Sequence, residues 1–418
     1  MDEEISPKKT LLARFKKPLL FIFLPLVLVV VSLLAYLHYK YPVASPFDSS
    51  TYLITSFNHP HAQMTKEVIG FLPYWRMDDT KYLRYDLVSE VIYFSLTAGA
   101  DGNFIKIVKN ETDPGWRWWN SPTVKDLITQ TQIRGGKVSV TVAMQKNKDL
   151  ETFLNNPSAQ TTLIDNLLAE VSNKHLDGIN IDFEYDGEPE ESLRQKFVEF
   201  NQNLTAKFKR ESPKTEMSID MYPLSVRKPR LFDIAKLAPL FDRVIIMSYD
   251  FYSSTSDIAG PVAPMKGFSD KKYIFDVTTS LDDYLKFVPK EKLVLGVPYY
   301  GWDYPVENGK TLQSKTLEGN DANGYPAIIS YGRAQSFDQL KPDQCQWDPD
   351  AEATWCWYTD PETDVNHQVW LEDDKSIGIK YDYAKNLDLA GVAIWTLGYD
   401  KQYPNLWQMI EDKFTLGK

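Results

Sequence analysis

The sequence contains few of the residues that most often bind metal ions. Only two cysteines, Cys345 and Cys356, and five histidines occur among its 418 residues. The spacing of the cysteines does not match a zinc knuckle, and the nearest histidine, His367, is isolated. We therefore expect no metal site and no cofactor. In an oxidising compartment two such cysteines pair, so we predict a disulfide between Cys345 and Cys356.

Positive charge is also scarce outside the first 17 residues. The chain has 46 Lys and Arg against 57 Asp and Glu, and five of the basic residues lie within residues 1–17. Binding to nucleic acid requires a basic stripe, which the scattered remaining cations do not form. We found no coiled-coil heptad and no internal repeat, and a neutral substrate fits this composition best.

Only one long hydrophobic run is present, at residues 18–37, PLLFIFLPLVLVVVSLLAYL. Twenty residues at about 1.5 Å each match a bilayer core of about 30 Å, which predicts a single transmembrane anchor. A cleaved signal peptide is the alternative, but its apolar region is usually only about 7–15 residues long. The basic cluster in residues 1–17 predicts a cytoplasmic N-terminus and an extracytoplasmic catalytic domain. Residues 38–66 read as a linker.

Residues 67–415 show a repeated alternation of strand and helix patterns. Eight apolar, β-branched runs predict strands at 67–75, 87–96, 137–144, 176–184, 216–223, 243–250, 292–302 and 391–398. Amphipathic helices are predicted between several of them, for example at 158–175 and 189–211. This pattern predicts an α/β fold with a buried parallel sheet, and eight units predict a closed (β/α)8 TIM barrel. The long gap before the last strand predicts an inserted subdomain within residues 303–385.

Polar residues interrupt the strand predicted at 176–184. Asn180, Asp182 and Glu184 have the same parity, so they share one face, and Glu184 lies at the end of the strand where barrel active sites lie. Unsatisfied buried polar groups cost about 1–3 kcal/mol each, so three in a row require a functional reason. Adjacent carboxylates raise each other's pKa, which can keep one protonated as a general acid. The alternatives are a solvated edge strand and a calcium loop, and the intervening apolar residues Ile179, Ile181 and Phe183 disfavour both.

Four segments occur in the order seen in one enzyme family. DGINIDFE (177–184) resembles the DGxDxDxE motif of the family-18 glycoside hydrolases, the chitinases and their relatives. MSYD (247–250), GVPYYGW (296–302) and GVAIWTLGYD (391–400) resemble segments from the ends of this family's sixth, seventh and eighth strands. The resemblance implies that the insertion between strands seven and eight has an α+β fold.

The resemblance also implies a role for each matching residue. Glu184 would protonate the glycosidic oxygen, and the substrate's own acetamido carbonyl would attack the anomeric carbon, in a retaining mechanism without an enzyme nucleophile. Asp182 would accept the acetamido N–H, and the Tyr249 hydroxyl would hold the acetamido carbonyl. The substrate would then be a β-linked N-acetylglucosamine polymer.

Further residues are predicted to bind the sugar. Trp395 would form the floor of the cleavage subsite, with ordinary barrel core as the alternative. Asp250 would anchor a neighbouring sugar. The Trp-rich segment 115–120, expected in a loop, could add a sugar contact or form a satellite cluster. The remaining candidates are Asn180, Met247, Tyr74, Phe94 and Tyr222.

Asn180 departs from the family pattern, which most often has Asp at this position. The amide removes one titrating group, so a shifted pH profile and a slower, specialised enzyme are expected. Chitin, peptidoglycan and N-glycans all remain open as substrates. A non-catalytic chitinase-like carbohydrate-binding protein is the alternative function, and the intact Glu184 argues against it.

Overall fold

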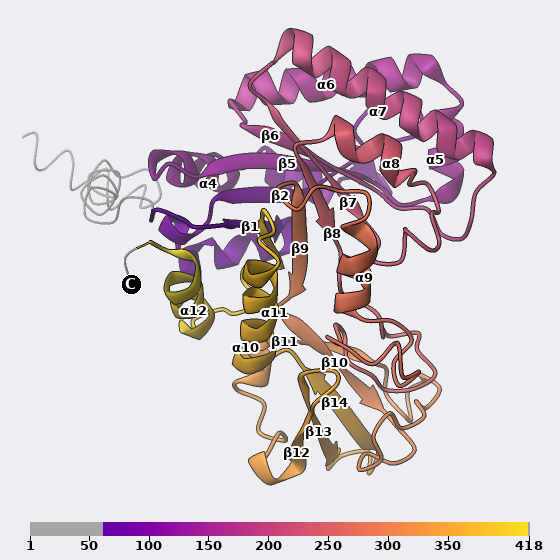
Figure 1. Ribbon diagram of the computed structural model, residues 1–418, viewed down its shortest axis with the longest axis vertical. Coiled ribbons are helices and arrows are strands. Elements are labelled where there is room, and N and C mark those ends of the chain that lie inside the picture. Colours follow the sequence, from indigo (N-terminus) through magenta and orange to yellow (C-terminus); the bar gives the residue numbers. More distant parts are fainter. Residues whose placement is uncertain (1–61, 417–418) are drawn as a thin grey trace, which may run out of the picture. The chain divides into compact units, whose positions relative to one another are not determined.

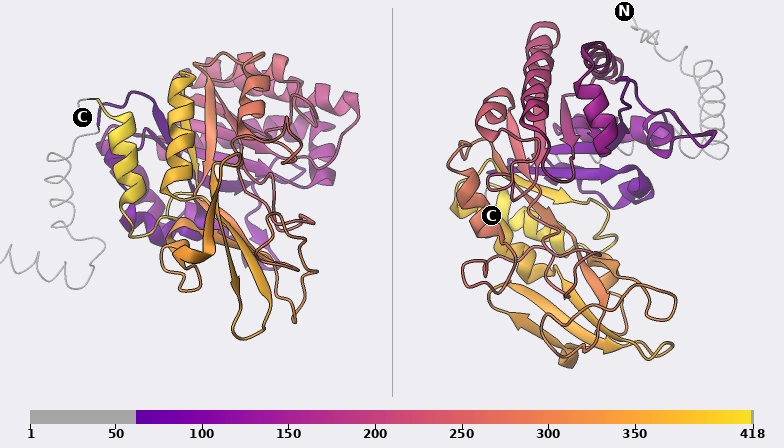
Figure 2. Two further views of the ribbon diagram at one scale, coloured as in Figure 1. Left: turned by 60° about the horizontal axis from the view of Figure 1, so that its bottom comes forward. Right: turned by 90° about the vertical axis from the view of Figure 1, so that its right-hand side faces the viewer.

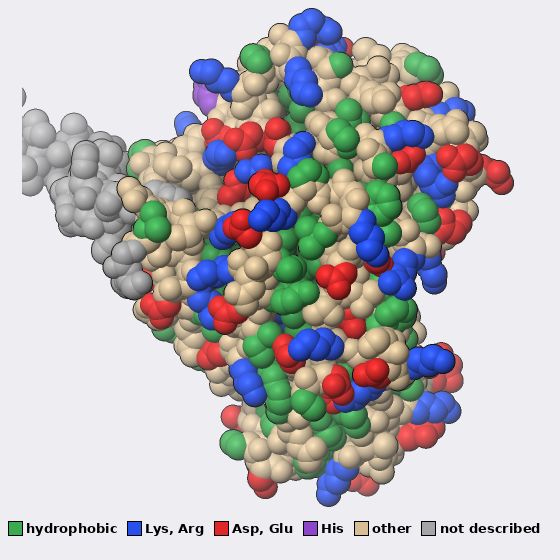
Figure 3. Space-filling view, viewed as in Figure 1, with side chains coloured by type: hydrophobic (Ala, Val, Ile, Leu, Met, Phe, Trp, Pro, Cys, Tyr) green, Lys and Arg blue, Asp and Glu red, His purple; other side chains and the backbone are tan. Residues whose placement is uncertain are grey.

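The computed structural model describes residues 62–416. The predicted anchor at 18–37, the cytoplasmic segment and most of the linker lie outside these residues. Within 62–416, none of the helices combines the length and apolar character needed to cross a bilayer. On the face shown in Figure 3, Lys and Arg side chains are interspersed with Asp and Glu, and they form no basic stripe.

A closed barrel of eight parallel strands forms the centre of this part of the chain (Figure 1). Each strand begins within three residues of a predicted run, because β-branched and apolar residues suit a sheet that is covered on both faces. The strands predicted at 243–250 and 391–398 end earlier than predicted, at Ile246 and Trp395. Around the barrel they are ordered β1 (Glu67–Pro73), β15 (Gly391–Trp395), β9 (Leu293–Pro298), β8 (Arg243–Ile246), β7 (Glu216–Met221), β6 (Gly178–Phe183), β5 (Lys137–Met144) and β2 (Glu90–Thr97).

Helices connect most of these strands and cover the outer face of the barrel. The connection from β1 to β2 differs, since it consists of two 3-10 segments, η3 (Tyr74–Tyr82) and η4 (Tyr85–Leu87). The α-helices are α3 (Pro114–Trp119), α4 (Pro122–Ile133), α5 (Asn147–Leu154), α6 (Pro157–Lys174), α7 (Glu191–Glu211), α8 (Ile234–Leu237), α9 (Val277–Tyr284), α10 (Tyr331–Ala334), α11 (Asp374–Asn386) and α12 (Asn405–Phe414).

Strand β6 shows how the sequence pattern positions the site. Phe183 points outward, and its ring stacks on Phe200 of α7 with centroids 5.8 Å apart. The same alternation turns Asn180 and Asp182 toward the barrel interior, where both are buried. Packing of the outward apolar side chains on α7 therefore orients β6 so that its polar side chains point into the barrel.

A five-stranded antiparallel sheet is inserted between β9 and β15 (Figure 2). Its strands are β11 (Ala327–Ser330), β10 (Tyr300–Pro305), β14 (Asn366–Leu371), β13 (Ala353–Thr359) and β12 (Cys345–Asp348), in that order. Cys345 and Cys356 face each other across β12 and β13 and form a disulfide. Helix α11 begins within the predicted range 303–385 but ends at Asn386, and it packs on the barrel strands β9 and β15.

The seventh predicted strand, 292–302, is wrong as a single element. The chain leaves the barrel after Pro298, and from Tyr300 onward it pairs with β11 and β14 instead of β8 and β15. Both halves are apolar and aromatic, so sequence pattern alone does not show where the pairing partner changes. This change of partner ties the inserted sheet directly to the C-terminal end of β9.

Candidate active site

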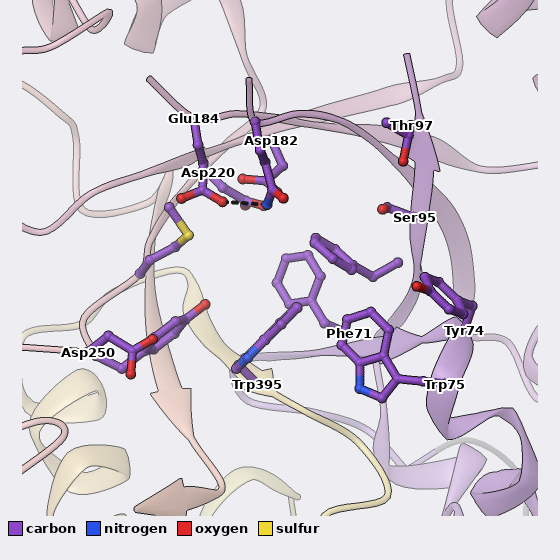
Figure 4. Close-up of a pocket in the computed structure, with 14 residues that line it drawn as sticks. Phe71, Tyr74, Trp75, Ser95, Thr97, Asp182, Glu184, Asp220, Asp250 and Trp395 are labelled. Carbon is purple, nitrogen blue, oxygen red and sulfur yellow. Dashed lines mark hydrogen bonds between the residues drawn. The ribbon is translucent and has the colours of Figure 1, made fainter. Parts of the chain in front are cut away.

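The barrel interior is divided into an apolar half and a polar half. Strands β1, β2, β8, β9 and β15 contribute an apolar cluster whose buried members include Phe71 and Phe94. Strands β5, β6 and β7 place polar side chains inside instead, namely Ser139, Thr141, Asn180, Asp182, Ser218 and Asp220. A cavity at the C-terminal ends of the strands is therefore bordered by aromatic rings on one side and carboxyl groups on the other (Figure 4).

This first cavity has a volume of about 340 Å³. Figure 4 shows Asp182, Asp220 and Glu184 together on one side of it, with Phe71, Trp75 and Trp395 across from them. The cavity is lined by Phe71, Tyr74, Trp75, Phe94, Ser95, Thr97, Gln145, Asp182, Glu184, Asp220, Met247, Tyr249, Asp250 and Trp395. Within residues 62–416, no cluster of three or more His, Cys, Asp or Glu side chains is arranged to hold a metal ion.

Asp182 is only 2% exposed and lies beside two further carboxyl groups. Burial raises its pKa, and the charges of Glu184 and Asp220 raise it further. Its Oδ1 atom is buried and has no hydrogen-bond partner among residues 62–416. An unsatisfied buried acceptor costs about 1–3 kcal/mol, so this oxygen is suited to receive an N–H group from a bound ligand.

Glu184 follows β6 directly and is partly exposed to the cavity. Its Oε1 accepts a hydrogen bond of 2.7 Å from Gln145 Nε2, drawn as the dashed line in Figure 4. Gln145 follows β5, the neighbouring barrel strand, in the same way. The bond fixes one carboxyl oxygen of Glu184. Tyr222 lies against the same carboxyl group, and burial together with this contact raises the pKa of its hydroxyl.

Trp395 lies at the centre of the aromatic side. Its ring makes an edge contact with Phe94, with centroids 4.7 Å apart, and contacts Phe71 and Trp75 in the same manner. Tyr249 lies nearly parallel to it, at an interplanar angle of 14° and 6.5 Å between centroids. Burial and the four neighbouring carboxyl groups keep the pKa of Tyr249 well above its usual value, so its hydroxyl remains a hydrogen-bond donor.

The structure brings most of the predicted site residues together. Eight line the first cavity: Glu184, Asp182, Tyr249, Trp395, Asp250, Met247, Tyr74 and Phe94. Tyr222 lines a second cavity instead. Asn180 lines neither, because it is fully buried beneath them and bonded to Thr141, Ser218 and Asp220. Its position corrects the prediction that it contacts substrate.

The Trp-rich segment 115–120 also differs from its prediction. It belongs to helix α3, whose N-cap Asp113 accepts from the backbone N–H of Trp116, so it is not a loop. Trp119 is completely buried and Trp116 packs on Phe104. No residue of this segment lines either cavity, and its role is packing.

Asp220 is the main site residue that the sequence reasoning missed. It lies on β7, is 3% exposed, and lines the first cavity. Burial raises its pKa to about 8, opposing the hydrogen bond from Asn180, and the charges of Glu184 and Glu90 raise it as well. The sequence pattern could have identified Asp220. Ser218 and Asp220 are spaced two residues apart along β7, as Asn180 and Asp182 are along β6, so both pairs point into the barrel.

A second cavity of about 490 Å³ is also lined by Glu184. It shares Glu184, Met247, Tyr249 and Asp250 with the first cavity. Its remaining lining residues are Tyr222, Pro223, Leu224, Lys228, Arg230, Phe251, Ile274 and Phe275. The two cavities therefore adjoin each other, and Glu184 is among the four residues that line both.

Comparison with known proteins agrees with this geometry. The family model described as glycosyl hydrolases family 18 matches residues 57–400. The di-N-acetylchitobiase of Rattus norvegicus is 27% identical over 310 residues, which cover 70% of this chain and 80% of the relative. The cortical fragment-lytic enzyme of Bacillus subtilis is 26% identical over 272 residues, covering 64% of this chain and 56% of that enzyme.

A solved structure supports the fold independently. The family-18 chitinase of Cycas revoluta, determined as a double mutant in complex with (GlcNAc)4, aligns with a TM-score of 0.69 at 18% identity. The alignment covers 83% of this chain and 99% of the chitinase. The chain belongs to glycosyl hydrolase family 18, and the closed eight-stranded barrel confirms the predicted fold.

Proposed function

We propose that this protein hydrolyses β-linked N-acetylglucosamine glycans with retention of configuration, and that Glu184 is the proton donor. The observation that carries the proposal is the position of Glu184 at the junction of two cavities, beside the buried Asp182. A sugar bound in each cavity would place the glycosidic oxygen next to the Glu184 carboxyl group. The aromatic floor of the first cavity suits the apolar face of a pyranose ring.

The proposed reaction breaks the bond between the anomeric carbon and the leaving oxygen. Glu184 gives its proton to that oxygen while the acetamido carbonyl of the substrate attacks the anomeric carbon. Asp182 Oδ1, which lacks a partner among the described residues, accepts the acetamido N–H, and the Tyr249 hydroxyl donates to the carbonyl. Water then opens the oxazolinium ion, gives a proton back to Glu184 and restores the N-acetyl group.

Glu184→Gln is the direct test, because the amide keeps the shape of the side chain but cannot donate the carboxyl proton. We expect hydrolysis of chitin oligosaccharides by the full-length protein to fall by at least about 100-fold, with binding of the same sugars retained. Product anomers followed by NMR should show retention. Turnover close to that of the unchanged protein would refute the assignment. Binding without turnover in both proteins would favour the non-catalytic alternative.

The proposal extends to location. Residues 18–37 would anchor the barrel at a membrane, with residues 1–17 in the cytoplasm and the cleft outside. A protease added to intact cells should then digest the barrel, while a tag at residue 1 stays protected. Protection of the barrel, or its release into the medium without the tag, would contradict this topology.

A further inference from the structure

The two cavities that meet at Glu184 differ in charge. The first is lined by four carboxyl groups, Asp182, Glu184, Asp220 and Asp250, and contains no Lys or Arg among its lining residues. The second has two basic residues, Lys228 and Arg230, and only two carboxyl groups, Glu184 and Asp250, both shared with the first. An anionic group would therefore be repelled less by the second cavity than by the first, and the two cations would attract it.

Arg230 is held in a fixed position at the second cavity. Its guanidinium lies over the ring of Tyr222, 4.1 Å from the centroid, and Nη1 donates to the backbone oxygen of Tyr185 at 3.3 Å. Within residues 62–416, its Nε and Nη2 groups have no hydrogen-bond partner. A stacked, partly bonded guanidinium with free N–H groups is well prepared to bind a carboxylate.

The side chain of Glu188 does not pair with this guanidinium. Glu188 Oε2 accepts from the backbone N–H of Arg230 at 3.1 Å, and it forms an ion pair with Arg194 at 3.4 Å. Lys228 is exposed and forms no ion pair among the described residues. Two cations therefore face the second cavity with their charge available.

The rest of the second cavity suits a sugar. Tyr222, Phe275 and Ile274 supply apolar surface, and Ile274 is 59% exposed. An aromatic and aliphatic wall packs on the C–H face of a pyranose, and the two cations line the same cavity. Since the first cavity has the aromatic floor and Asp182, it holds the acetamido sugar, and the second holds the leaving group.

We propose that the second cavity is a leaving-group subsite for an amino sugar that carries a carboxylate, such as a 3-O-lactyl ether, which Lys228 and Arg230 bind. The inference rests on the proposed function and specifies its substrate class. The bond cleaved is then the one from a neutral N-acetylglucosamine residue to a carboxylated neighbour. A neutral polymer would occupy the same cavity without using the two cations.

A matched pair of substrates isolates this feature. GlcNAc-β-1,4-MurNAc and GlcNAc-β-1,4-GlcNAc differ at the leaving sugar only in the lactyl ether, and the methyl ester of the first removes its charge while keeping its bulk. With the full-length protein we expect kcat/KM to be roughly tenfold higher for the acid than for the ester or the neutral disaccharide. The preference should fall as salt is added, because added ions screen the attraction.

Variants then assign the preference to the two side chains. Lys228→Gln and Arg230→Gln should each reduce the ratio of the kcat/KM values for the acid and the ester. Arg230→Lys should restore part of the ratio, which a purely structural role of Arg230 would not predict. Lys125→Gln, on the exposed face of α4, is the matched control and should leave the ratio unchanged.

Failure of this inference is distinguishable from failure of the proposed function. Equal kcat/KM for acid, ester and neutral disaccharide, all abolished by Glu184→Gln, would overturn the subsite assignment and leave the hydrolase intact. A preference for the acid that survives Lys228→Gln combined with Arg230→Gln would also overturn it. No turnover of any of the three substrates, or of longer chitin oligosaccharides, would refute the proposed function itself.

Discussion

Asn180 on β6 donates a hydrogen bond from Nδ2 to Oδ1 of Asp220 on β7, over 3.0 Å. A second bond from Nδ2 reaches Ser218 Oγ at 3.0 Å, and Asn180 Oδ1 accepts from Thr141 at 2.9 Å. All hydrogen-bonding atoms of this buried amide are therefore satisfied. The amide stands where the motif usually has a carboxyl group, and the neighbouring strand supplies a buried carboxyl group, Asp220, in addition to Asp182.

This relationship predicts the effect of restoring the usual residue. Asn180→Asp would place a carboxyl group against Asp220 and remove both donated hydrogen bonds. We expect the acid limb of the pH–rate profile to move to higher pH, because an added negative charge raises the pKa of the neighbouring carboxyl groups. An unchanged profile over the whole active range would show that Asn180 serves only as a neutral support for its neighbours.

Asp220 should make stability depend on pH. Its carboxyl group ionises near pH 4 in the unfolded chain and at about 8 in the folded protein. Between these values the folded state retains a proton that the unfolded state has lost, so stability falls as pH rises, by up to about 1.4 kcal/mol per pH unit. Asp220→Asn should flatten this slope in denaturant unfolding from pH 4 to 8. Equal slopes in both proteins would show that the raised pKa is absent.

Tyr249 should act in the transition state more than in substrate binding. Tyr249→Phe removes one donor to the acetamido carbonyl, and we expect kcat to fall by about 100- to 1000-fold with KM nearly unchanged. The matched control is Tyr331→Phe, which removes the hydroxyl of a buried tyrosine bonded to Asp374, outside both cavities. A rise in KM with kcat unchanged would contradict the assigned role.

Trp395 should determine sugar affinity. Trp395→Ala in the Glu184→Gln background should weaken binding of a chitin tetrasaccharide by about tenfold or more, since the ring forms the floor of the first cavity. Trp116→Ala removes a partly buried ring outside both cavities and serves as the control. Calorimetric titration measures the affinity of each variant for the tetrasaccharide. Equal affinities would show that Trp395 serves only in packing.

Much of the fold is predictable because its signals are local. The alternation along β6 and the apolar runs of the other barrel strands depend on neighbouring residues, so strand positions and the inward faces of Asn180 and Asp182 follow from periodicity. Glu184, Tyr249 and Trp395 could be proposed because short motifs carry them. The break between β9 and β10 could not be predicted, because it depends on which distant strands pair with each half of the segment.

The sequence by itself determined the eight barrel strands' approximate positions and the position of Glu184 after β6, because each depends on a short, continuous segment. Only the tertiary structure decided that Asp220 joins Asp182 and Glu184, that Asn180 is a buried support, and that Lys228 and Arg230 line a cavity together with Glu184. These residues come from separate βα units. Closure of the barrel brings them within hydrogen-bonding and electrostatic range, and the pKa of a carboxyl group depends on that distance rather than on its position in the chain.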